Sequence, residues 1–170
     1  MKFKPNYIII PLITIMVAVL GSVFTGAGME WYQAEILKPD LTPPNWAFPI
    51  AWNLIFILTT IAVLIIWNKG DASNKLVQLL TDKPSSQTYW WIIGLFIANA
   101  VLNIGWTLLF FNLQMVQAAL VEMILLEATL VALIAILLRY SRLAAMLLLP
   151  YTIWVGFATY LTYAIWIINY

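Results

Sequence analysis

Amide and aromatic side chains at helical spacing, inside long apolar stretches, are the residues of this chain best placed to do chemistry. Asn99, Asn103 and Trp106 recur at intervals of four and three residues, which places them on one face of a helix. A buried amide needs a hydrogen-bond partner, because an unsatisfied polar group in hydrocarbon costs on the order of a few kcal/mol. The pattern predicts either hydrogen bonds between helices or a cavity whose amides bind the polar edge of a ligand.

A second stripe, near the end of the chain, consists of Tyr151, Trp154, Ala158 and Leu161, and Trp52 supplies a further indole. Tryptophan combines a flat apolar face with one N–H donor. The stripe is explained either by packing between helices or by rings that line a cavity for a flat hydrophobic ligand. The candidate ligand-binding residues are Trp52, Asn99, Asn103, Trp106, Tyr151, Trp154, Ala158 and Leu161.

Two acids, Glu122 and Glu127, lie within an otherwise apolar stretch. Carboxyl groups inside a membrane are candidate functional groups. Each is explained either by a protonated, hydrogen-bonded carboxyl or by a role linked to a proton or a ligand.

The connector at 28–46 is unlike an ordinary polar linker. It carries the aromatic residues Trp31 and Tyr32 and the prolines Pro43 and Pro44, which stiffen the backbone. Charged residues accompany them. The combination predicts an ordered lid over a site at the membrane surface.

The elements that must position these residues are membrane-spanning helices. Hydrophobic residues make up 64% of the chain, charged residues 9%, and the mean hydropathy is +0.95, which excludes a water-soluble globule. A membrane helix needs roughly 20 mostly apolar residues. The sequence predicts an all-α, polytopic, five-helix transmembrane bundle formed by one domain, 1–170. The expected spans are 7–27, 47–67, 89–111, 116–138 and 143–168, with a tight hairpin between the third and fourth.

Basic residues are distributed unequally between the two sides of this bundle. Five spans place the N-terminus, the loop 69–88 and the turn 139–142 on one side, and these segments contain all the basic residues except Lys38. The positive-inside rule therefore predicts N-in and C-out, with the lid on the outer side. Because no targeting presequence precedes the first span, we expect an integral protein of a bacterial plasma (inner) membrane.

Composition excludes several classes of site and partner. The chain contains no Cys and no His, and so lacks thiolate chemistry and the commonest haem and metal ligand. We expect no metal site. The net charge of +1 does not favour nucleic acid as a partner. No hydrolase triad, phosphate loop or redox-cofactor motif indicates a conventional enzyme.

Small residues indicate where helices can approach one another. Four of them cluster on the first span, and Gly94 and Ala98 are separated by three residues on the third. The first-span residues are Ala18, Gly21, Ser22 and Thr25. We expect close helix contact at the first cluster and a homodimer through the third span.

The motifs together resemble the TspO/MBR family of tryptophan-rich sensory proteins and translocator proteins, also called the peripheral benzodiazepine receptor. They follow one another from the end of the first span to the fifth in the order and spacing typical of the family. The matching segments are Trp31-Tyr32, Leu37-Lys38-Pro39, Thr42-Pro43-Pro44, Trp52, Asn99, Asn103, Trp106, Phe110-Phe111, Leu149-Pro150-Tyr151, Trp154, Phe157-Ala158-Thr159 and Leu161.

The resemblance implies a five-helix bundle, often dimeric, that binds porphyrins, sterol-like lipids and aromatic drugs in a pocket under the first loop. It assigns the polar ligand contacts to Trp52 and Asn99, a facing ring to Trp154 and the pocket wall to Ala158. The lid would include Tyr32, Pro43 and Pro44. The basic residue of the family's C-terminal sterol motif is absent after Leu161-Thr162-Tyr163. Specific cholesterol binding is therefore not expected.

Three functional hypotheses follow. The first is a membrane receptor or binding protein for porphyrin-like tetrapyrroles and other flat hydrophobic ligands, acting in sensing or transport, with no required cofactor. The alternative is light- and oxygen-dependent porphyrin degradation, implied by the resemblance, in which Trp52 and Trp154 would be catalytic. The third is a structural bundle without a ligand, whose rings serve only in packing.

Overall fold

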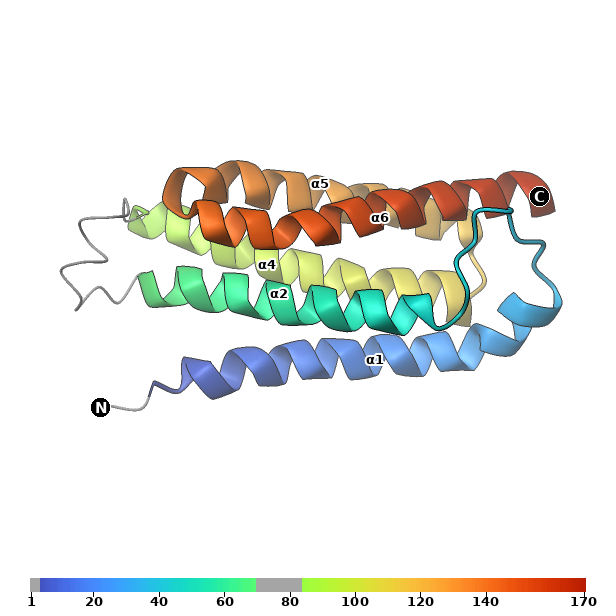
Figure 1. Ribbon diagram of the computed structural model, residues 1–170, viewed down its shortest axis with the longest axis horizontal. Helices are drawn as coiled ribbons and strands as arrows, with labels where there is room; N and C mark the ends of the chain where they lie inside the picture. The colour runs from blue at the N-terminus through green and yellow to red at the C-terminus, as the bar shows by residue number, and fades with distance from the viewer. Residues whose placement is uncertain (1–3, 70–83) are drawn as a thin grey trace.

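The chain folds into a bundle of long helices that lie nearly side by side (Figure 1). The computed structural model describes residues 4–69 and 84–170, and all regular elements in these two ranges are helical. Within these two ranges, five helical segments are long and apolar enough to span a membrane. The elements are α1 (Asn6–Ala34), α2 (Ala47–Lys69), α4 (Ser86–Thr107), which continues as the π-helix η1 (Leu108–Asn112), α5 (Val116–Tyr140) and α6 (Arg142–Asn169).

Local sequence signals explain where several helices begin. The side chains of Ser85 and Ser141 accept hydrogen bonds from the backbone N–H groups of Thr88 and Ala144, and so cap the starts of α4 and α6. Pro49 lies in the opening turn of α2, where its missing N–H costs little. The predicted five-span, all-α bundle is confirmed.

The predicted tight hairpin between the third and fourth spans is also present. η1 ends at Asn112, α5 begins at Val116, and Gln114 between them has a φ of 55°. A non-glycine residue rarely adopts this left-handed conformation, and here it occurs at the tight turn between the two helices. The loop 69–88 of the sequence analysis lies largely outside the described residues.

The first boundary of the connector differs from the prediction. α1 continues to Ala34, so Trp31 and Tyr32 belong to its last turns and the connector begins at Glu35 instead of residue 28. Packing explains the longer helix. The rings of Trp31 and Tyr32 contact Phe110, at centroid distances of 5.8 and 6.0 Å. These contacts stabilise the last turns beyond the end of the apolar run.

Close contact between α1 and η1 depends on one glycine. A Cβ atom at Gly28 would overlap the backbone carbonyl of Phe111. The glycine therefore allows the two backbones to lie in close contact. α1 remains helical on both sides of it.

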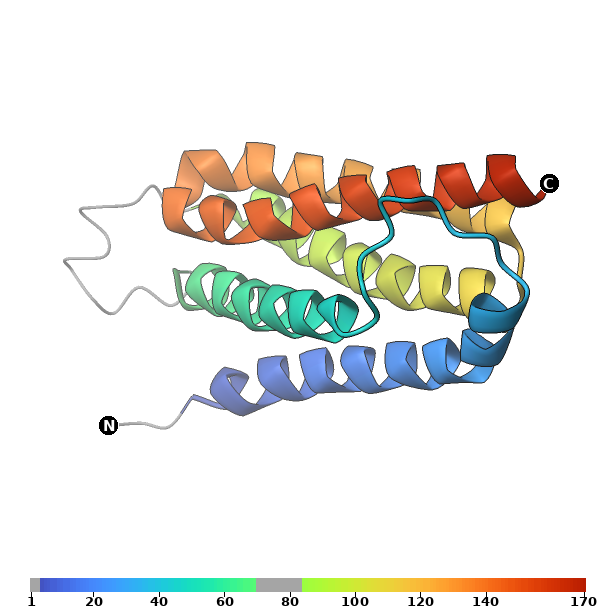
Figure 2. The same cartoon turned by 45° about the vertical axis from the view of Figure 1, so that its right-hand side comes forward.

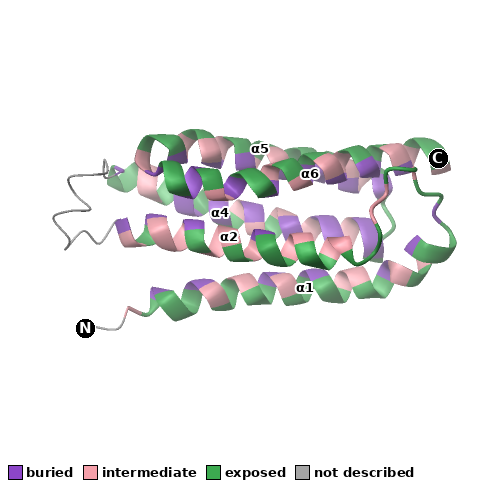
Figure 3. Cartoon of the chain, viewed as in Figure 1, coloured by how far each residue is buried: buried purple, intermediate pink, exposed green. Residues whose placement is uncertain are grey.

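The core lies mainly between α4, α5 and α6, while α1 is peripheral. Fully buried leucines follow one face of α5 at intervals of four, three and four residues, namely Leu126, Leu130, Leu133 and Leu137. Buried residues of α4, α5 and α6 face one another, and most of α1 is exposed or partly exposed (Figure 3). Exposed apolar side chains on α1 suit contact with lipid.

Candidate functional site

A cavity of about 320 Å³ lies between α1, α2, α4–η1 and α6 at the end of the bundle that carries the connector 35–46. Its volume is at the lower end of the roughly 300–1,000 Å³ typical of small-molecule sites. The lining residues are Ala18, Gly21, Ser22, Thr25, Met29, Tyr32, Asn45, Phe48, Pro49, Trp52, Asn53, Phe56, Asn103, Trp106, Thr107, Phe110, Phe111, Trp154, Ala158, Leu161, Thr162 and Ile165.

Small side chains on α1 create part of this space. Ala18, Gly21, Ser22 and Thr25, which we expected to allow close helix contact, all line the cavity. A Cβ atom at Gly21 would lie 3.8 Å from the side chain of Thr107, an ordinary contact distance. The tight backbone approach of α1 occurs further along, at Gly28.

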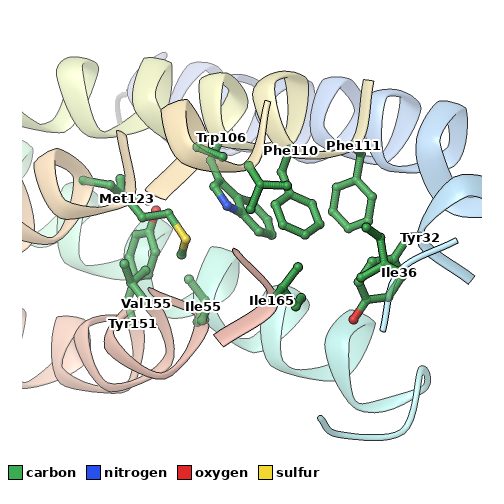
Figure 4. Close-up of a cluster of buried hydrophobic side chains, with 14 of the residues drawn as sticks. Tyr32, Ile36, Ile55, Trp106, Phe110, Phe111, Met123, Tyr151, Val155 and Ile165 are labelled. Carbon is green, nitrogen blue, oxygen red and sulfur yellow. The ribbon is translucent and has the colours of Figure 1, made fainter. Parts of the chain in front are cut away.

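Aromatic rings form the opposite wall. The ring of Trp52 lies 6.2 Å from that of Trp106 and 6.0 Å from that of Tyr151. Trp106 stacks on Phe110 at 5.7 Å, and Figure 4 shows the row of rings continuing through Phe111 to Tyr32. The cavity is therefore bounded by flat apolar surfaces, which suit a flat apolar ligand.

Trp154 reaches the cavity from α6 and contacts Phe48 at a ring distance of 5.8 Å. Among the described residues, the indole Nε1 atoms of Trp154 and Trp106 are buried and have no hydrogen-bond partner. Buried polar groups in folded proteins nearly always have a partner. Both N–H groups are enclosed by the surrounding side chains and do not open onto the cavity.

The two predicted amides of α4 share one helix face but lie one turn apart, and they have different surroundings. Asn103 lines the cavity and donates from Nδ2 to the hydroxyl oxygen of Tyr151 at 2.8 Å. Asn99 lies outside the lining and donates to the hydroxyl oxygen of Thr129 on α5 at 2.9 Å. Asn99 therefore makes an interhelical hydrogen bond, the first of the two alternatives. Asn103 makes such a bond and also lines the cavity.

The remaining predicted residues divide in the same way. Trp52, Trp106, Trp154, Ala158 and Leu161 line the cavity together with Asn103. Tyr151 is buried behind this wall, against Trp52. Of the predicted lid residues, Tyr32 lines the cavity, Trp31 packs against Phe110, and Pro43 and Pro44 precede the lining residue Asn45 in the connector.

The connector runs close to the C-terminal part of α6 (Figure 2), and the side chain of Asn169 hydrogen-bonds to it. Asn169 accepts from the backbone N–H of Leu37 through Oδ1 at 2.9 Å and donates from Nδ2 to its carbonyl oxygen at 3.0 Å. The Nζ atom of the next residue, Lys38, lies 4.7 Å from the centroid of the Tyr32 ring. These contacts order the connector next to the cavity.

Several lining residues were not singled out from the sequence. Asn53 and Phe56 follow Trp52 on α2, and Thr162 and Ile165 extend the stripe of α6. Helical phase from Trp52 and from the α6 stripe would have found Phe56, Thr162 and Ile165 but not Asn53, which directly follows Trp52. No sequence signal marks Asn169, because its partners are backbone atoms distant in the chain.

Glu122 and Glu127 do not line the cavity. Glu122 is buried, and neither of its carboxyl oxygens has a partner among the described residues. A Cβ atom at Gly105 would lie 3.7 Å from Oε1 of Glu122, so this carboxyl packs against α4. Oε2 of Glu127 is likewise buried without a partner in that part of the chain.

The fold and the cavity define a polytopic integral membrane protein with an aromatic site inside its helix bundle. The sequence profile of the TspO/MBR family matches residues 9–167. The chain belongs to this family, and its relatives support a role in sensing or binding at a membrane.

Relatives from bacteria, archaea and animals share most of the chain. A tryptophan-rich protein TspO of Archaeoglobus fulgidus is 34% identical over 95% of this chain and 98% of its own length. One from Chlorobaculum tepidum is 33% identical over 88% of this chain and 86% of its own. The human translocator protein is 30% identical over 86% of this chain and 80% of its own.

Proposed function

We propose that the protein is a membrane receptor or binding protein for porphyrin-like tetrapyrroles and other flat hydrophobic molecules, acting in sensing or transport. The observation that carries the proposal is the cavity with its aromatic wall. A flat ring system would bury apolar area against Trp52 and Trp106.

A titration with protoporphyrin in the dark tests this function. We expect a saturable change in porphyrin absorbance with the detergent-purified protein, and clearly weaker binding with the double variant Trp52→Phe/Trp154→Phe. The matched control is Trp90→Phe/Trp91→Phe, because these two indoles are 64% and 65% exposed on α4. The control should bind as the wild type does. Non-saturable uptake that is equal in all three proteins would indicate partitioning into detergent and refute the proposal.

Light- and oxygen-dependent porphyrin degradation is a second candidate, favoured by the presence of both Trp52 and Trp154 at the cavity. An excited porphyrin would generate reactive oxygen next to these oxidisable rings. Illumination of the saturated complex separates the two functions. Loss of products in Trp52→Phe or Trp154→Phe with binding retained would support degradation. If binding and products fall in parallel, the rings act only in binding.

We further propose a homodimer in a bacterial plasma (inner) membrane, oriented N-in and C-out with the connector outside. A Cβ atom at Gly94 on α4 would meet nothing within 4 Å, so this face has room for a second helix. Arg139 and Arg142 lie at the bundle end opposite the connector, in agreement with the positive-inside rule. Cross-linking in native membranes and a reporter fused after Tyr170 would test dimer and orientation separately.

A further inference from the structure

The cavity has no charge of its own. None of the described residues that line it is Asp, Glu, Lys or Arg, and its polar groups are amides, hydroxyls and indoles. A charged group on a ligand would lose its hydration inside this cavity without gaining an ionic partner. The ring system of a ligand fits the interior, and any ionised substituent must remain at the mouth.

One cation of the described connector, Lys38, lies next to a residue that lines the cavity. Its Nζ atom lies over the ring of Tyr32, a ring that itself lines the cavity. The backbone of the preceding residue, Leu37, is fixed by the two hydrogen bonds to Asn169. Pro39 on the other side restricts the backbone of Lys38 to extended conformations. The backbone that carries the ammonium group is therefore held in place by the connector.

The ammonium group is also available for a ligand. Lys38 is exposed. Among the residues 4–69 and 84–170, its ammonium group contacts the ring of Tyr32. Three carboxylates, Glu30, Glu35 and Asp40, belong to the same end of the bundle, but they are exposed and do not line the cavity. A ligand edge that leaves the cavity past Tyr32 would meet Lys38.

We propose that Lys38 is a specificity residue that selects flat hydrophobic ligands with a carboxylate at one edge. The ring would occupy the aromatic cavity, and the carboxylate would pair with the Lys38 ammonium at the mouth. The inference rests on the proposed binding function and names the ligand class for the same site.

The test combines a charged and a neutral ligand with a charged and a neutral side chain. Protoporphyrin, which has two carboxylates, and its dimethyl ester are titrated in the dark into the wild type and into Lys38→Gln. We expect Lys38→Gln to weaken binding of the acid about three- to fivefold, the upper range for an exposed ion pair, and to leave the ester unchanged. The Lys38→Arg variant, which keeps the charge, should bind the acid nearly as the wild type does.

Salt dependence provides an independent readout. At an ionic strength of about 1 M, where the Debye length is about 3 Å, the preference of the wild type for the acid should largely disappear. Equal weakening of acid and ester by Lys38→Gln would assign Lys38 a packing role on Tyr32 and overturn the inference. Unchanged binding of both ligands would overturn it as well, with the binding function intact. Failure of both ligands to bind the wild type saturably would instead refute the function itself.

Discussion

Replacement of Asn169 by alanine should release the connector from α6. The side chain makes two hydrogen bonds to the backbone of Leu37 and a third to the carbonyl oxygen of Ile165 in its own helix. A typical hydrogen bond contributes about 0.5–1.5 kcal/mol net, and exposed bonds lie toward the lower end because water replaces them. Loss of the two connector bonds should therefore cost about 1–2 kcal/mol. This corresponds to an increase of about 5–30-fold in the opening equilibrium of this segment.

Amide hydrogen exchange at Leu37 measures this opening directly. We expect its N–H to exchange at least several times faster in Asn169→Ala, with the protection of Leu113 in the hairpin unchanged. The matched control is Tyr170→Ala, which removes a larger side chain from the next position, one that is 72% exposed. Equal exchange at Leu37 in Asn169→Ala and the wild type would show that the connector is held by other contacts. The reasoning about its attachment would then be wrong.

Two further predictions concern the helix contacts around the cavity. Gly28→Ala should lower the free energy of unfolding by about 2 kcal/mol. Overlap with the Phe111 backbone costs about 3 kcal/mol, and the better helix propensity of alanine returns about 1 kcal/mol. Gly26→Ala, where a Cβ atom meets nothing within 4 Å, should be neutral or stabilising; equal destabilisation would exclude the close-approach explanation. Asn99→Ala should cost about 0.6 kcal/mol in detergent unfolding, since the Thr129 hydroxyl keeps its bond to its own helix, and ligand affinity should not change. A large loss of affinity would place Asn99 at the ligand.

Much of the fold is predictable because the membrane imposes its own length and composition on helices. Apolar runs and the polar break near Gln114 identify the helices and the hairpin without any tertiary information. The end of α1 is not predictable in this way. Its last turns are stabilised by rings of Trp31 and Tyr32 packed on η1, a contact between residues about eighty positions apart.

The site is predictable where helical phase determines it. The stripe of Trp154, Ala158 and Leu161 reaches the cavity as a unit because these residues share one face of α6. Asn99 and Asn103 share a face by spacing, yet only Asn103 reaches the cavity. One turn of helix is enough to bring Asn99 opposite Thr129 of α5, and the sequence contains no information on where the neighbouring helices cross.

The central claim, that the cavity is the binding site, is tested most directly by filling it from α1. Thr25 lines the cavity, and Val23, two positions earlier, is 60% exposed on the same helix. Both are replaced separately by phenylalanine, folding is verified by helical circular dichroism and thermal unfolding, and protoporphyrin is titrated in the dark. If the cavity is the binding site, Thr25→Phe abolishes or strongly weakens saturable binding. Val23→Phe binds as the wild type does. Equal binding by the two folded variants would contradict this claim.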